Sequence, residues 1–144
     1  MTETKILIIE NAPRDFGQIR KKLVGDFYAI LPEKVDEMID CIESGGNRII
    51  DYVLKQIDEN YKELKLILCD IRLNNNDSSG ERVVQAIRNH RIPDFPIWTS
   101  LIPVIAITGH VVRQDPIIKA GADFSLNKEK INKDEKYFLT LVET

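Results

Sequence analysis

The sequence predicts an α/β protein built on an open, doubly wound parallel sheet. Short apolar runs typical of strands alternate along the chain with segments that have helical periodicity. Runs such as ILII and LILC show no alternation of polar and apolar residues, as expected of strands that helices cover on both faces. Since crossovers between parallel strands are right-handed, an open sheet with helices on both sides is the simplest arrangement.

Five apolar runs have the length and composition of strands, and each is separated from the next by a helical pattern. The predicted strands are residues 5–9, 27–31, 66–69, 104–107 and 124–126. Because every connection is long enough to contain a helix, we expect parallel pairing throughout.

The helical segments are recognised by apolar residues that share one face. Pro13 precedes the first segment, while Gly45 and Gly46 divide the stretch between the second and third strands into two helices. The apolar residues that mark these segments are Phe16, Ile19 and Leu23; Val35, Met38, Ile39 and Ile42; Ile50, Val53, Leu54 and Ile57; Val83, Val84 and Ile87; Ile117 and Ile118; Tyr137, Phe138, Leu141 and Val142.

The bulk properties indicate one globular domain, residues 1–144, in the cytoplasm. A chain of 144 residues has the usual size of a domain with one core. Its net charge of -3 provides no general attraction to nucleic acid or to a membrane, and MTETKILIIEN lacks the features of a secretory signal. Cys41 and Cys69 form no CxxC motif, so we expect both to be small buried apolar residues in a reducing compartment.

Polar residues follow several of the predicted strands at the point where each strand ends. Glu10 and Asn11 follow the first, Asp70 the third, Thr108 the fourth, and Lys128 lies just beyond the fifth. One such residue commonly just begins a loop. Together, however, they bring carboxylates, a hydroxyl and an ammonium to the carboxyl edge of the sheet, where α/β proteins of this type bind ligands.

The combination of residue types at this edge indicates phosphoryl chemistry. Clustered carboxylates repel each other and are tolerated when a hard divalent cation lies between them. A cation, the ammonium of Lys128 and the hydroxyl of Thr108 beside Asp70 could stabilise a phosphoryl group. We therefore predict that Asp70 is a nucleophile that accepts a phosphoryl group.

Four motifs, ILIIEN, LILCDIRL, PVIAITGH and AGADFSLNK, resemble those of response-regulator receiver domains of two-component signalling, in order and roughly in spacing. The resemblance covers nearly the whole chain. It implies a flavodoxin-like (βα)5 fold with strand order 2-1-3-4-5, here with an extra helix between strands 2 and 3. It also implies a signalling domain, not an enzyme with a separate substrate, which catalyses only its own phosphorylation and dephosphorylation.

The resemblance implies a role for each residue of the predicted site. Asp70 would accept the phosphoryl group from a phosphohistidine of a sensor histidine kinase or a histidine phosphotransfer protein, and so switch the binding of a downstream protein. Thr108 and Lys128 would contact the phosphoryl oxygens. The ligands of Mg²⁺ would be Glu10, Asn11, Asp70 and the backbone carbonyl of Arg72.

Several residues depart from the family pattern. Asn11 stands where the family usually has Asp, which removes one negative charge and should weaken Mg²⁺ binding. Ser125 stands at the switch position, where Tyr or Phe is common, and Phe124 points to the opposite face of its strand. An alternative is therefore a divergent receiver that acts as a phosphorylation-independent interaction module. His110, two residues beyond Thr108, either tunes the phosphoryl lifetime or is an ordinary surface residue.

Three segments are longer than the family pattern: residues 32–65, the loop NNNDSSG after Asp70, and residues 91–102, which include Trp98. Each is either a partner-specific surface or additional packing. His90 lies in the basic stretch RNHR, and we expect it to be a solvated helix end whose charge favours the helix dipole.

Other functional classes fit less well. Phosphatases that form an aspartyl phosphate usually need an acid two residues after the nucleophile, where this chain has Arg72. The segment ENAPRDFG after the first strand has no glycine-rich phosphate loop. The last helical pattern would complete the receiver, in a protein that either stands alone or is part of a longer regulator.

Overall fold

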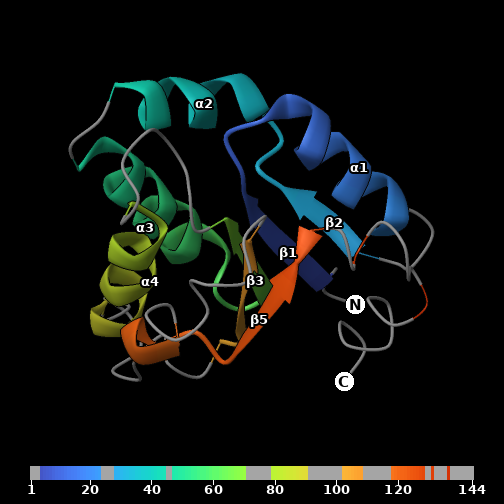
Figure 1. Ribbon diagram of the computed structural model, residues 1–144. Helices are drawn as coiled ribbons and strands as arrows, with labels where there is room; N and C mark the ends of the chain where they lie inside the picture. The colour runs from blue at the N-terminus through green and yellow to red at the C-terminus, as the bar shows by residue number, and fades with distance from the viewer. Residues whose placement is uncertain are drawn as a thin grey trace.

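The computed structural model describes residues 4–23, 28–44, 47–70, 79–90, 102–108, 118–128, 131 and 136. Its five strands pair in parallel in the order β2-β1-β3-β4-β5, which confirms the predicted topology (Figure 1). The strands are β1 (Thr4–Ile9), β2 (Tyr28–Leu31), β3 (Leu64–Asp70), β4 (Val104–Thr108) and β5 (Phe124–Asn127).

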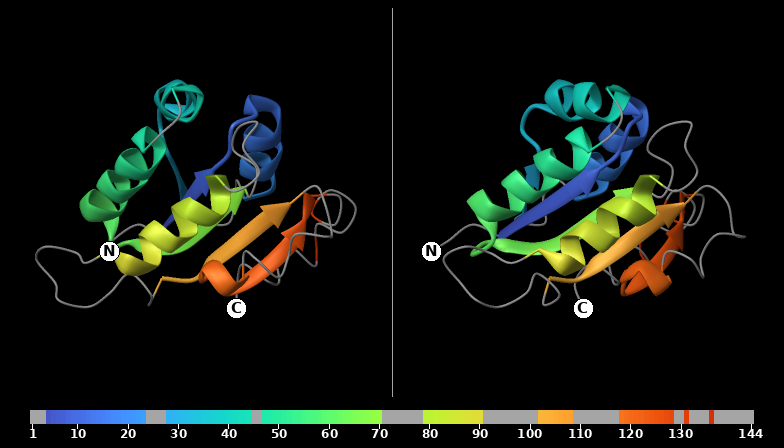
Figure 2. Two further views of the ribbon diagram at one scale, coloured as in Figure 1. Left: turned by 60° about the vertical axis from the view of Figure 1, so that its left-hand side comes forward. Right: turned by 90° about the vertical axis from the view of Figure 1, so that its left-hand side faces the viewer.

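Helices connect the strands and cover both faces of the sheet. The helices are α1 (Pro13–Leu23), α2 (Val35–Glu43), α3 (Arg48–Asn60) and α4 (Ser79–Asn89). Because the chain moves outward from β1 to β2 and then back across β1 to β3, right-handed crossovers place α1 on one face and α3 and α4 on the other. Figure 2 shows α3 and α4 along the same side of the sheet. The predicted pair of helices between β2 and β3 is confirmed.

The core lies around the two strands at the centre of the sheet. Consecutive side chains of these strands are at most 1% exposed, namely Ile6, Leu7, Ile8 and Ile9 in β1 and Ile67, Leu68 and Cys69 in β3. Both faces of a strand are buried when helices pack on both sides of the sheet, which explains the absence of alternation in ILII and LILC.

Two strands, β3 and β4, extend to the polar residues that were expected to follow them. Pairing between β3 and β4 continues to Asp70 and Ile107, and pairing between β4 and β5 continues to Thr108 and Asn127. Asp70 is therefore the last residue of β3, and its backbone is held in the sheet. Glu10 directly follows β1.

The buried face of α3 contains the expected residues and one more. Val53 and Ile57 are buried, and Ile50 and Leu54 are partly buried and pack against the core, as the predicted stripe requires. Helix α3 begins at Arg48, and Ile49, which the prediction did not include, is also buried, so the apolar stripe begins one residue earlier than expected.

Residues 118–120 are helical, as the pattern before Gly121 predicted, although Ile118 itself is 43% exposed. Two further expectations were wrong in detail. Cys41 is partly exposed, whereas Cys69 is buried as predicted. The side chain of His90 is only 17% exposed, and its Nε2 lies 2.7 Å from Oδ1 of Asp58. His90 therefore links the end of α4 to α3 instead of ending in solvent, because α3 and α4 pack side by side.

The enlarged segment 32–65 forms a groove with the edge of the sheet. The groove has a volume of about 610 Å³, and its lining carries both charge signs, including Lys34, Glu37, Lys55 and Glu59. Neither Glu10 nor Asp70 lines it.

Residues 74–78 of the stretch NNNDSSG, the segment 91–101 with Trp98, and residues 137–144 of the last predicted helix lie outside the described residues, whereas Ser79 and Gly80 begin α4. Within the part of the chain that is described, no helix has both the length and the apolar character needed to cross a membrane.

Candidate functional site

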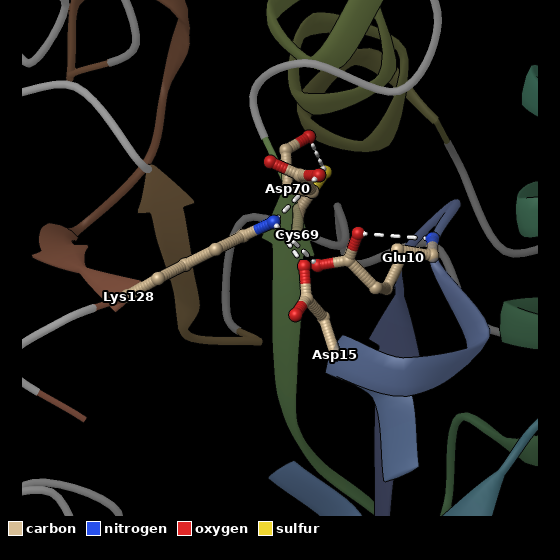
Figure 3. A network of polar contacts seen from close by, with 6 residues as sticks. Glu10, Asp15, Cys69, Asp70 and Lys128 are labelled. Atoms are coloured by element: carbon tan, nitrogen blue, oxygen red, sulfur yellow. Dashed lines mark hydrogen bonds and ion pairs between the residues drawn. The ribbon is translucent and has the colours of Figure 1, made fainter. Parts of the chain in front are cut away.

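Residues from three strand ends and one helix meet at the carboxyl edge of the sheet (Figure 3). Glu10 follows β1, Asp70 ends β3, and Lys128 follows β5. Asp15 joins them from the first turn of α1. Since β1 and β3 are neighbours and β5 lies beyond β4, the long side chain of Lys128 reaches back across the edge toward the two carboxylates.

The ammonium of Lys128 lies among three carboxylates. Its Nζ lies 3.1 Å from Oε2 of Glu10, 3.1 Å from Oδ2 of Asp15 and 3.3 Å from Oδ2 of Asp70. The contacts with Asp15 and Asp70 are also hydrogen bonds in which Lys128 donates. The ammonium thus offsets part of the negative charge that this edge gathers.

Glu10 is the most deeply buried member of the group, with a side chain that is 1% exposed. Its Oε1 accepts a hydrogen bond from the backbone N–H of Ala12 at 3.2 Å. The carbonyl of Ala12 in turn accepts a hydrogen bond from the N–H of Phe16, which begins α1. Its Oε2 lies 3.1 Å from Nζ of Lys128, and the two groups form an ion pair when Glu10 is ionised.

The buried charges change the protonation of the group. Burial, followed by the charge and hydrogen bond of Asp70, raises the pKa of Glu10 to about 8, and Lys128 offsets only part of this rise. Burial by itself would lower the pKa of Lys128, but the charges of Asp70 and Glu10 outweigh it and the pKa is raised. Burial and the same two carboxylates raise the pKa of the Cys69 thiol, so this cysteine stays protonated.

Asp15 is a member of the site that the sequence analysis missed. It lies two residues into α1 and five residues after Glu10. The available signal was its position, because the first turn of a helix that directly follows β1 must lie at the same edge of the sheet as the end of that strand. An acidic residue in the first turn of a helix is ordinarily explained by its favourable interaction with the helix dipole, so nothing in the sequence indicated that Asp15 also contacts Lys128.

The other predicted site residues are described only in part. Asn11 is partly exposed beside Glu10, and the backbone of Thr108 ends β4 next to Asn127. The side chain of Thr108, together with Arg72 and His110, lies outside the described residues.

Ser125, which was predicted to stand at the switch position, has a small polar side chain. The Oγ of Ser125 is buried and has no hydrogen bond from the described residues. The neighbouring Phe124 is 39% exposed.

The donor chemistry of the site suits a hard divalent cation. Among the described residues, no three His, Cys, Asp or Glu side chains are placed to hold a metal ion as they stand. The ammonium of Lys128 is the cation at the point where the carboxylates of Glu10, Asp15 and Asp70 converge. Carboxylate oxygens are the ligands that Mg²⁺ takes from proteins, so these residues fit Mg²⁺ provided that the ammonium moves.

No protein-family model matches the sequence, and no curated protein matches it. Solved structures do match. The N-terminal domain of a response regulator/sensory box/GGDEF 3-domain protein from Carboxydothermus hydrogenoformans is 20% identical, with a TM-score of 0.65 and coverage of 97% of this chain and 91% of that chain.

Two further matches have a bound metal. The Mn²⁺-bound form of response regulator Rcp1 is 21% identical, with a TM-score of 0.54 over 96% of this chain and 88% of that chain. A response regulator from Burkholderia pseudomallei with a phosphorylated aspartic acid, calcium ion and citrate is 20% identical, with a TM-score of 0.55 over 88% of this chain and 60% of that chain. The chain therefore has the fold of response-regulator receiver domains.

Proposed function

We propose that residues 1–144 form a divergent receiver domain that accepts a phosphoryl group on Asp70. The observation that carries this proposal is the convergence of Glu10, Asp70 and Lys128 at the carboxyl edge of the parallel sheet. These elements are far apart in the sequence, and their convergence gives a nucleophile, an acidic partner and a cation in one site.

The chemistry would be a transfer between two side chains. An oxygen of Asp70 attacks the phosphorus of a phosphohistidine, the P–N bond breaks, and its electron pair returns to the imidazole of the donor, which takes up a proton. Lys128 neutralises the phosphoryl oxygens, and Thr108 donates a hydrogen bond to one of them. Mg²⁺, when bound, would supply further charge neutralisation, and Glu10, Asp70, the Asn11 side chain and the carbonyl of Arg72 would hold it.

Two of the matching proteins support the chemistry of this proposal. Rcp1 was solved in a Mn²⁺-bound form, and the Burkholderia pseudomallei protein has a phosphorylated aspartic acid and a calcium ion. On the same ground we propose a sensor histidine kinase or a histidine phosphotransfer protein as donor, a downstream protein as target, and the cytoplasm as location. Ser125 and His110 are proposed to tune the switch and the phosphoryl lifetime.

Acetyl phosphate with Mg²⁺ tests the proposal directly. We expect the intact mass of the wild-type protein to increase by one phosphoryl group, and fragmentation to place that group on Asp70. Asp70→Asn should stay unmodified, whereas Asp51→Asn, which changes an exposed aspartate of α3, should react as wild type does. Modification that persists in Asp70→Asn would show that another residue is the acceptor.

A second candidate function is a phosphorylation-independent interaction module. It is favoured by the neutral amide of Asn11 beside Glu10 and by the short side chain of Ser125 at the switch position. If the folded protein takes up no phosphoryl group from acetyl phosphate at saturating Mg²⁺, this second function replaces the first.

A further inference from the structure

The ammonium of Lys128 is shared between the proposed phosphoryl acceptor and a residue outside the predicted site. An ammonium has three N–H donors, and the described structure places three carboxylates around it. The hydrogen bond to Asp15 is 3.1 Å long and that to Asp70 is 3.3 Å, so Asp15 holds the ammonium at least as closely as Asp70 does.

The position of Asp15 is set by the packing of α1. Phe16, the next residue, and Ile19 are buried in the core, so the first turn of the helix cannot shift without exposing them. Lys128 also lies against this helix, where it lines a small pocket together with Asp15, Gln18 and Ile19. Asp15 therefore draws the ammonium of Lys128 toward α1 from a fixed position (Figure 3).

A phosphoryl group on Asp70 would need the same ammonium. The group adds negative charge on the side of Lys128 that faces β3, whereas Asp15 attracts Lys128 from the side of α1. Since one ammonium cannot optimise its contacts with both, the contact with Asp15 opposes the phosphorylated state.

We propose that Asp15 is a positioning residue that competes with Asp70 for the ammonium of Lys128 and thereby weakens the binding of a phosphoryl group at Asp70. This role rests on the proposed function. A different role for Asp15, as a cation ligand in place of the acidic residue missing at position 11, predicts the opposite effect, because its removal would then weaken Mg²⁺ and phosphoryl binding together.

The test uses beryllofluoride, a phosphoryl mimic, with saturating Mg²⁺ and the full chain. Its affinity is measured by ¹⁹F NMR titration, and that of Mg²⁺ alone by calorimetry. We expect Asp15→Asn to bind beryllofluoride about fivefold more tightly, a size typical of one partly exposed ion pair. Asp36→Asn is the matched control, since Asp36 is an exposed aspartate in the first turn of another helix, α2, and this variant should behave as wild type does.

A double-mutant cycle separates the contact from a general effect of charge. If Asp15 acts through Lys128, the gain from Asp15→Asn should disappear in the Lys128→Gln background. If the gain persists there, Asp15 acts only as a distant negative charge and the proposal is wrong. Melting curves in chelator establish that each variant is folded.

The remaining outcomes distinguish this proposal from the proposed function. Equal beryllofluoride affinity in wild type and Asp15→Asn overturns the role of Asp15 and leaves the proposed function intact. If Asp15→Asn binds both Mg²⁺ and beryllofluoride more weakly than wild type, the competing role is wrong and Asp15 is instead a ligand of the cation. If Asp15→Asn binds beryllofluoride and wild type does not, the role of Asp15 is supported. If neither protein binds beryllofluoride, both proposals are overturned.

Discussion

At the residue scale, Glu10 illustrates how the site departs from ordinary surface chemistry. A carboxyl that is 1% exposed lies beside a second buried carboxyl, Asp70, and a single ammonium serves both along with Asp15. Burial penalises the charged form of Glu10, and the charge of Asp70 adds to that penalty. In the metal-free protein, ionisation of Glu10 therefore destabilises the folded state.

This imbalance predicts a pH dependence of stability in chelator. The pKa of Glu10 is raised from 4.5 to about 8 on folding, so its contribution favours the folded state at low pH and is lost as the pH rises through about 8. Glu10→Gln removes this titration. We expect its unfolding free energy, relative to wild type, to increase by more than about 1 kcal/mol between about pH 5 and pH 8.5. Parallel profiles for the two proteins in urea denaturation would contradict the prediction.

The neutral side chain of Asn11 leads to a second prediction, which concerns the affinity for Mg²⁺. An aspartate at this position would add one anionic oxygen at a partly exposed site. We expect Asn11→Asp to bind Mg²⁺ about tenfold more tightly in calorimetry and to react faster with acetyl phosphate. In chelator the same variant should melt at a lower temperature than wild type, because the added carboxylate repels Glu10 and Asp70. An unchanged Mg²⁺ affinity would place Asn11 outside the coordination sphere of the metal.

At the element scale, Arg88 ties the end of α4 to the beginnings of the last two strands. Its guanidinium donates to the carbonyl of Gly121 at 2.7 Å, to the carbonyl of Ile102 at 2.7 Å, and to Oδ2 of Asp123 at 2.6 Å. The same oxygen of Asp123 accepts the N–H of Val104 at 2.8 Å. This network holds β4 and β5 in place relative to α4, and β5 carries Lys128 to the site.

Gly121 is the point at which this network tolerates no side chain. Its φ is +125°, and a Cβ would lie 2.5 Å from Cγ of Arg88. We expect Gly121→Ala to lower the unfolding free energy by about 1–3 kcal/mol, because the backbone would be strained and Arg88 would have to leave its acceptors. Urea denaturation measures the loss.

Gly17 is the matched control for this substitution. A Cβ there meets no atom within 4 Å, and the residue is exposed within α1. Gly17→Ala should therefore raise the unfolding free energy by about 0.5–1 kcal/mol, from helix propensity. A Gly121→Ala variant as stable as Gly17→Ala would show that Arg88 does not depend on this glycine.

At the scale of the whole molecule, the sheet carries residues from distant parts of the chain to one edge, and the proposed switch position lies on its last strand, β5. In the family that the sequence resembles, the aromatic switch lies on the last strand. Here that strand has Ser125, with its Oγ buried, and an exposed Phe124 on the neighbouring position. Ser125 has no aromatic ring that could move between a buried and an exposed position. We therefore expect that phosphorylation changes the structure beyond β5 only slightly.

Amide spectra with and without beryllofluoride test this expectation. We expect shifts near Asp70 and Lys128 but only small shifts in residues 131–144. The control is Ser125→Tyr, which should enlarge the shifts in that segment if an aromatic ring is what transmits the change. Large shifts in residues 131–144 of the wild-type protein would contradict the prediction.

Much of the fold follows from the order of residues along the chain. The strands ILII and LILC are apolar throughout, and a helical pattern lies between successive strands, so a covered parallel sheet was predictable before any contact was known. Glu10, Asp70 and Lys128 were predictable as neighbours for the same reason, since the ends of parallel strands meet at one edge. These conclusions depend on local patterns and on the handedness of crossovers.

The tertiary structure alone decided which side chains share a proton, a charge or a hydrogen bond. Lys128 and Asp15 are 113 residues apart, and their contact depends on how α1 is packed and how far a long side chain reaches across the sheet edge. His90 pairs with Asp58 because α3 lies along α4, and neither helix pattern contains that information. Periodicity places a residue on a face of an element, but contacts between elements depend on their rotation and separation, which only the packing of the whole core determines.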